Sequence, residues 1–109
     1  MTDRPPAASV VAVVVTFQPD LAEVTALLAA LTPQVGAVVV VDNGTERAVL
    51  DTVTRVAGAA GAAVLPLGVN RGVAAAQNAG IDWARERGAG FVLLSDQDSL
   101  PAPDMVERL

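Results

Sequence analysis

Two aspartates separated by one residue, Asp96 and Asp98, come directly after an apolar run over residues 91–94. Side chains two positions apart at a strand end project to the same side, so these carboxylates can converge while Gln97 points elsewhere. Two such charges about 4 Å apart repel by roughly 4 kcal/mol at an effective dielectric constant near 20. Magnesium or manganese removes that cost and bridges carboxylates to phosphates. The pattern indicates a metal-diphosphate site, and a solvated acidic turn is the alternative.

The composition restricts which other chemistry the chain can perform. Its 109 residues are 52% hydrophobic, which is enough for one small domain with a core. Cysteine, histidine and lysine are missing, so disulfides, thiolate nucleophiles, zinc-thiolate sites and a Ser-His-Asp triad within the chain are excluded. The net charge of −5 argues against nucleic acid as a partner. Carboxylates, arginines, amides and hydroxyls remain.

The beginning of the chain carries no targeting signal that we recognise. The longest apolar run there, residues 10–15, is much shorter than a membrane span, and residues 1–6 lack the basic start of a signal peptide. We therefore expect a soluble cytoplasmic segment, with a flexible tail over residues 1–8 and one domain over residues 9–109.

Strand-like and helix-like patterns alternate along the chain. Asp20 with Glu23 resembles a capping box, Thr45 can cap a second helix, and Gly88 can end a third. Strands are predicted over residues 9–16, 37–41, 62–67 and 91–95, with helices starting near residues 20, 45 and 73 between them. The apolar composition of the last strand is typical of a buried central strand in a parallel sheet.

This alternation predicts an α/β fold. Right-handed crossovers between the strands give an open three-layer α/β/α sandwich with a mostly parallel, Rossmann-like sheet. We expect the strands, numbered along the chain, to lie in the order 3-2-1-4. Ligands bind such sheets outside the carboxyl ends of the strands. The unusual polar residues all follow strand ends, over residues 16–17, 42–43, 68–72 and 96–98, which favours one site at that rim.

Two of these strand ends each have a functional and a structural interpretation. Asp42 can accept hydrogen bonds from a nucleoside base or ribose, or it can belong only to a turn. The loop of Asn70, Arg71 and Gly72 can feed a helix N-terminus that suits a base or diphosphate, or it can be a solvated loop.

The helix expected over residues 73–87 carries further residues of interest. Asn78 is either a buried amide or a part of the same pocket, and Trp83 is expected in the core or an interface. Residues 74–76 and Gly80 are expected to let the helix lie close to the sheet. The chain has neither G-x-G-x-x-G after its first strand nor a P-loop, so dinucleotide and P-loop functions lose their main support.

Four stretches, VVVTFQPD, VVVVDNGT, LGVNRGVAAAQNAGI and FVLLSDQDS, resemble in order and spacing the amino-terminal half of a family 2 glycosyltransferase with the GT-A fold. The last two stretches are most similar to its rhamnosyltransferase branch. The resemblance covers nearly the whole chain from Val10 onward. It implies the donor-binding half of an inverting enzyme that uses a nucleotide-diphosphate sugar, with dTDP-rhamnose as the expected donor, in cell-surface or cell-wall polysaccharide synthesis.

The resemblance also implies roles for individual residues. The nucleotide-sugar-binding residues are expected to be Thr16, Phe17, Asp42, Asn70, Arg71, Gly72, Asn78 and Asp96. Thr16 and Phe17 would border the base, Asp42 would bind the base or ribose, and Asp96 would face the ribose. Asp98 would ligate the magnesium or manganese ion that bridges the diphosphate.

One departure from the family pattern concerns the acceptor side. The family's acceptor pocket and catalytic base lie downstream of D-x-D, whereas this sequence ends at Leu109, within an expected helix over residues 104–109. We therefore expect the catalytic base beyond Leu109 and a chain that alone binds donor without transferring sugar. In full-length form, a saccharide or lipid-linked acceptor and a position peripheral to the inner membrane face are expected. The fourth strand's edge could support a homo-oligomer.

Two other function classes compete with this one. A haloacid-dehalogenase-type phosphatase also uses a D-x-D at a strand end, but its motif opens the first strand of the domain and needs a downstream lysine. Here the motif closes the fourth strand and the chain has no lysine. A non-catalytic nucleotide-sugar-binding or assembly module is the remaining alternative.

Overall fold

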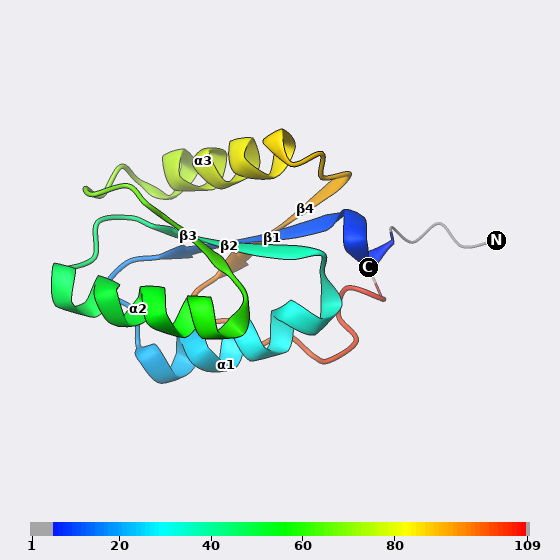
Figure 1. Ribbon diagram of the computed structural model, residues 1–109, viewed down its shortest axis with the longest axis horizontal. Helices are drawn as coiled ribbons and strands as arrows, with labels where there is room; N and C mark the ends of the chain where they lie inside the picture. Colours follow the sequence, from blue (N-terminus) through cyan, green and yellow to red (C-terminus); the bar gives the residue numbers. More distant parts are fainter. Residues whose placement is uncertain (1–5, 109) are drawn as a thin grey trace.

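A parallel sheet of four strands forms the middle layer of the protein (Figure 1), as described over residues 6–108 by a computed structural model. The strands are β1 (Val10–Thr16), β2 (Ala37–Asp42), β3 (Ala63–Pro66) and β4 (Phe91–Asp96). They lie in the order β3-β2-β1-β4, and each neighbouring pair is parallel. The predicted three-layer, Rossmann-like α/β fold and its strand order are confirmed.

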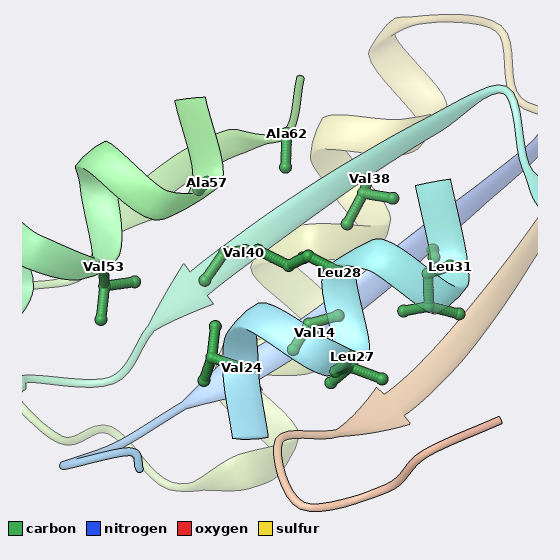
Figure 2. Close-up of a cluster of buried hydrophobic side chains, with 11 residues drawn as sticks. Val14, Val24, Leu27, Leu28, Leu31, Val38, Val40, Val53, Ala57 and Ala62 are labelled. Carbon is green, nitrogen blue, oxygen red and sulfur yellow. The ribbon is translucent and has the colours of Figure 1, made fainter. Parts of the chain in front are cut away.

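One face of the sheet is covered by α1 (Leu21–Leu31) and α2 (Arg47–Ala60) (Figure 1). Valines of β1 and β2 pack there against leucines of α1, as Figure 2 shows. The Asp20 carboxylate accepts a hydrogen bond from the Glu23 N–H at 3.1 Å, which confirms the predicted cap. The predicted cap of α2 is wrong, because Thr45 lies two residues before the helix and its hydroxyl binds Asp42 instead.

The other face of the sheet is covered by α3 (Val73–Glu86) (Figure 1). Ala76, Gly80 and Ala84 are its buried residues. A Cβ atom at Gly80 would lie 2.3 Å from Val13 Cγ1, so only glycine lets the helix lie this close to the sheet, as predicted. The small residues 74 and 75 are exposed and do not have the predicted packing role.

Trp83 packs against this same face of the sheet, in agreement with the sequence prediction of a core position. Its ring is partly covered on the outside by Arg87, whose guanidinium carbon lies 3.7 Å from the ring centroid. The aromatic side chain therefore closes the end of the α3 layer that lies away from the strand carboxyl ends.

The burial that the apolar composition indicated for the fourth strand is not observed, whereas its position at the edge agrees with the predicted strand order. Strand β4 pairs only with β1 and forms an edge of the sheet. Phe91, Val92 and Leu94 are exposed by 52%, 38% and 45%. An apolar run indicates that both faces of a strand are buried, but it does not indicate whether a second neighbouring strand is present.

The segment after β4 turns back under the first face of the sheet and ends near the beginning of β1 (Figure 1). The helix predicted over residues 104–109 does not form in the described part, where residues 103–108 make turns. The physical reason is Gln34, which closes the 3-10 turn η2 (Thr32–Gln34). Its amide binds the Ala102 carbonyl at 2.8 Å and the Val106 N–H at 2.9 Å, the two groups that would pair in a helix.

At the other end, Ala7–Ser9 forms a short 3-10 turn, η1, so residues 7 and 8 of the expected flexible tail are ordered. Residues 1–5 of that predicted tail lie outside the described residues, as does Leu109. Among residues 6–108, none of the helices combines the length and apolar character that a membrane span requires.

Candidate functional site

The carboxyl ends of the strands surround a cavity of about 470 Å³, here called the rim cavity. Its lining comes from all four strand ends and the start of α3: Val15, Phe17, Asn43, Asn70, Gly72, Val73, Asp96, Gln97 and Asp98. Phe17, Asn43, Asn70 and Gly72 form what we call the amide side, and Asp96 and Asp98 form the carboxylate side. The predicted convergence of polar residues at this rim is therefore observed.

Asp42 lies beneath the cavity and does not line it. It is fully buried, and its Oδ1 accepts hydrogen bonds from the hydroxyls of Thr16, at 2.7 Å, and Thr45. Its Oδ2 accepts the Thr45 N–H at 2.8 Å. Of the two interpretations from the sequence, this geometry is that of a turn-forming aspartate. Contact of Asp42 with a base or ribose stays a prediction, as does contact of Thr16, which is also fully buried.

Asn43 fixes the loop on the amide side. Only 2% of its surface is exposed, and its Oδ1 accepts the Arg71 N–H at 2.8 Å while its Nδ2 donates to Asn70 Oδ1 at 3.1 Å. Asn70 Oδ1 also accepts the Gly72 N–H at 2.8 Å. The sequence analysis did not single out Asn43 as a site residue. Its position in an Asn-Gly pair signals a turn, but nothing local signals a partner 27 residues away.

Gly44 allows the same loop to approach. Its φ is +93°, and a Cβ atom there would lie 2.6 Å from the Asn70 backbone nitrogen. Any other residue would therefore be strained in this conformation and would also push the loop away. The Asn-Gly turn and the Asn70 loop form one joined unit.

Arg71 and Asn78 are less closely connected with the cavity than expected. Both are exposed, and neither side chain lines the cavity. Ala76 and Gly80 face the sheet, and a residue two positions from either lies about 200° around the helix, so Asn78 points outward. The alternative of a buried amide at Asn78 is wrong. The nucleotide-binding roles of both residues stay predictions.

The carboxylate side is open. Asp96 and Asp98 are exposed and line the same cavity, and neither carboxylate has a hydrogen bond or ion pair within residues 6–108. Those residues also contain no group of three or more His, Cys, Asp or Glu able to hold a metal ion. Two unpartnered carboxylates fit a hard cation such as magnesium, which takes its other ligands from phosphate and water.

Gln97 turns back toward β1, where the sequence did not predict a partner for it. Its Oε1 accepts the Phe17 N–H at 2.8 Å, and its Nε2 donates to the Phe17 carbonyl at 3.2 Å. Phe17 itself is 44% exposed at the cavity. These two hydrogen bonds, here called the Gln97 bridge, join the two sides of the rim cavity. They span 80 residues of sequence, and no local pattern predicts them.

A second cavity, of about 370 Å³, adjoins β4 and shares Asp96 with the rim cavity. Most of its remaining lining is apolar and comes from β4 and the segment that follows it, including Leu94, Leu100 and Met105. Asp96 therefore lines both cavities.

Comparisons with known proteins agree with the sequence prediction. Residues 9–109 match the model of the family described as glycosyl transferase family 2. The chain is also 37% identical over 101 residues to the protein named dTDP-rhamnosyl transferase RfbF from Shigella flexneri. That match covers 93% of this chain and 33% of the relative, so the chain spans about a third of the relative's length. The haloacid-dehalogenase-type alternative is not favoured by these matches.

Proposed function

This chain belongs to glycosyl transferase family 2, and we propose that its rim cavity binds the nucleotide-diphosphate sugar of an inverting glycosyltransferase, with dTDP-rhamnose as donor. The observation that carries the proposal is the division of one cavity into an amide side and a carboxylate side. The nucleotide part of a nucleotide-diphosphate sugar has the same division, with a neutral nucleoside followed by a charged diphosphate that carries the sugar. The name of the Shigella relative supports the choice of donor.

The amide side suits the nucleoside. Phe17 presents an exposed aromatic surface, and Asn43 and Asn70 hold amide groups at the cavity wall. Helix α3 begins beside them at Val73, and Gly72 provides no side-chain cap, so the first N–H groups of the helix remain available to an acceptor atom of the ligand. In this proposal Asp42 acts from below, by holding the two turns through Thr16 and Thr45.

The carboxylate side suits a metal-bound diphosphate. Asp98 would hold a magnesium or manganese ion with Asp96 beside it, since both carboxylates face the cavity without another partner among the described residues. When bound, the ion supplies positive charge that stabilises the departing diphosphate. The chain's own carboxylates thus orient the charged end of the donor.

The transfer step is proposed for the whole protein, with a saccharide or lipid-linked acceptor in cell-surface or cell-wall polysaccharide synthesis. Inverting transfer needs a base opposite the leaving diphosphate. The carboxylates that line the rim cavity are Asp96, expected to face the ribose, and Asp98, expected to hold the metal ion on the leaving-group side. Asp104 is ion-paired with Arg108 at 3.7 Å. We therefore propose that residues 1–109 alone bind donor without transferring sugar.

Self-association is a separate proposal. The exposed apolar side chains of β4 lie on an unpaired sheet edge, and such edges invite pairing with another chain. Light scattering over a range of protein concentrations tests it. A concentration-dependent increase in mass is expected, and a constant monomer mass would contradict it.

Calorimetric titration tests the donor proposal. The chain should bind dTDP more tightly than UDP or GDP in the presence of manganese, and excess chelator should weaken that binding. Absence of binding for all three nucleotides would contradict the proposal.

A radiolabelled dTDP-rhamnose assay with saccharide and lipid-linked acceptors should show no transfer by this chain, whereas turnover near 1 per second would show that the base lies within it.

A further inference from the structure

Gln97 extends the contact between β1 and β4 beyond the last backbone pair. The parallel register of these strands ends at Val15 and Asp96. In the residue after Asp96, the side-chain amide of Gln97 continues the contact. Its oxygen accepts the Phe17 N–H, and its nitrogen donates to the Phe17 carbonyl. A primary amide carries the same donor and acceptor groups as a peptide bond. It can therefore make the two hydrogen bonds that the backbone of a longer strand would make.

The Gln97 bridge lies between the two candidate metal-binding residues in sequence. The turn that carries them has one backbone hydrogen bond of its own, from the Ser99 N–H to the Asp96 carbonyl at 3.2 Å. Both carboxylates are exposed and without a partner in the described part of the chain. The Gln97 bridge therefore holds this turn against β1 beyond the strand pairing, which ends at Asp96.

The other end of the bridge rests on a fixed frame. The residue after Phe17, Gln18, has its N–H bound to the Thr45 hydroxyl at 3.0 Å. Thr45 is in turn bound by the buried Asp42 carboxylate. Phe17 thus belongs to the amide side, whose position is set by these hydrogen bonds. The two hydrogen bonds between Gln97 and Phe17 place the carboxylate side relative to it.

We propose that Gln97 is a positioning residue that sets the spacing between the nucleoside end and the metal-diphosphate end of the donor site, an inference that rests on the proposed function. A nucleoside diphosphate has a limited length, and its nucleoside and its diphosphate must contact the amide side and the carboxylate side at the same time. A loosened turn can still bind a metal ion, and the amide side can still bind a nucleoside. The loss appears when one ligand engages both, as a weaker coupling between the two ends.

Two substitutions separate this role from simple packing. Gln97→Met keeps the length and volume of the side chain but cannot form the bridge. Gln97→Ala removes the bulk of the side chain together with the bridge. Calorimetry should give affinities for manganese alone, thymidine alone, and dTDP with manganese. In both variants the dTDP affinity should fall about tenfold while the other two stay within about twofold.

Gln34 offers a matched control. Its side-chain amide also binds backbone groups distant in sequence, at Ala102 and Val106, which are 68 and 72 residues away, and none of these three residues lines the rim cavity. Gln34→Met should lower stability and leave all three affinities unchanged. Wild-type coupling in Gln97→Met, or an equal loss of thymidine and dTDP affinity, would overturn the proposal.

Amide hydrogen exchange provides a readout without ligand. In Gln97→Met the N–H groups of Phe17 and Ser99 should exchange about tenfold faster, while that of Gln18, held by Thr45, stays unchanged. Unchanged exchange at Phe17 and Ser99 would overturn the proposal. If the wild-type chain fails to bind dTDP with manganese, the proposed function fails, and the exchange result still decides whether Gln97 positions the turn.

Discussion

The two sides of the rim cavity differ in how far the fold itself satisfies their polar groups. On the amide side, Asn43 and the supporting Asp42 are 2% and 0% exposed, and their side chains are hydrogen-bonded within the chain. On the carboxylate side, Asp96 and Asp98 are exposed and have no partner among residues 6–108. The difference indicates that folding alone forms the amide side, whereas the carboxylate side would be completed by the proposed metal-bound diphosphate.

This contrast separates the expected effects of substitution. Groups on or beneath the amide side contribute to the stability of the fold, because removing one leaves buried partners unsatisfied. Groups on the carboxylate side contribute to binding, because folding leaves them in solvent. Four substitutions test this distinction.

Asp42→Ala should have the largest effect on stability. It leaves two hydroxyls and one backbone N–H without their buried acceptor, and we expect the free energy of unfolding to fall by about 3 kcal/mol. Urea denaturation measures this. Asp42→Asn retains one acceptor oxygen and should lose less. An Asp42→Ala chain of normal stability but weak dTDP binding would instead favour direct contact between Asp42 and the nucleoside.

Asp98→Asn should have the opposite signature. Loss of an anionic ligand should weaken dTDP binding in manganese by about 100-fold and remove its dependence on the ion. The free energy of unfolding should change by less than about 0.5 kcal/mol, because the carboxylate has no folded-state partner among the described residues. Titrations with and without chelator, together with urea denaturation, measure both. Equal dTDP affinity in the variant and the wild type would contradict the assignment of the metal ligand.

Gly44→Ala should affect the amide side through the backbone. The added Cβ meets the Asn70 backbone at a positive φ, so we expect a loss of about 2 kcal/mol in stability together with weaker thymidine binding. Gly61→Ala is a useful control, because it has a positive φ but no atom within 4 Å of the added Cβ. If both variants bind thymidine like the wild type, contact between the two loops does not shape the nucleoside surface.

Gln18→Gly should have the smallest effect. Gln18 has a φ of 43°, which is unfavourable for a residue with a Cβ atom. Its backbone N–H bond to Thr45 survives the substitution, and its side chain contributes a single long contact, 3.4 Å, to the Glu46 N–H. We expect the free energy of unfolding, measured by thermal or urea denaturation, to rise by about 0.5 kcal/mol. A loss above about 1 kcal/mol would show that the Gln18 side chain is needed to hold the turn.

The fold and the location of the site could be predicted because both depend on local patterns. The β-branched runs over residues 10–16 and 37–42 and the cap at Asp20 each indicate their own structure, and parallel strands place their carboxyl ends together. The edge position of β4 follows from the predicted strand order, but the exposure of its apolar side chains could not be predicted, because hydrophobicity reports expected burial and not which neighbours are present.

The internal connections of the site could not be predicted for a different reason. Asn43 and Gln97 act through hydrogen bonds to residues 27 and 80 positions away, and each looks like an ordinary turn residue in sequence. Asp42 was recognised as unusual, but its burial beneath the cavity depends on the hydroxyls of Thr16 and Thr45. Residue type suggested which chemistry is present, and tertiary contacts decide which groups remain free to perform it.

The division of the donor site is tested most directly by amide chemical shifts during stepwise addition of thymidine and then of dTDP with magnesium. Thymidine should shift the amide signals of Phe17, Asn43 and Asn70 alone, and dTDP with magnesium should also shift those of Asp96 to Asp98. In Asp98→Asn the second set of shifts should be lost while the first remains. Thymidine shifts outside the rim cavity, or dTDP shifts that leave residues 96–98 unchanged, would contradict this division.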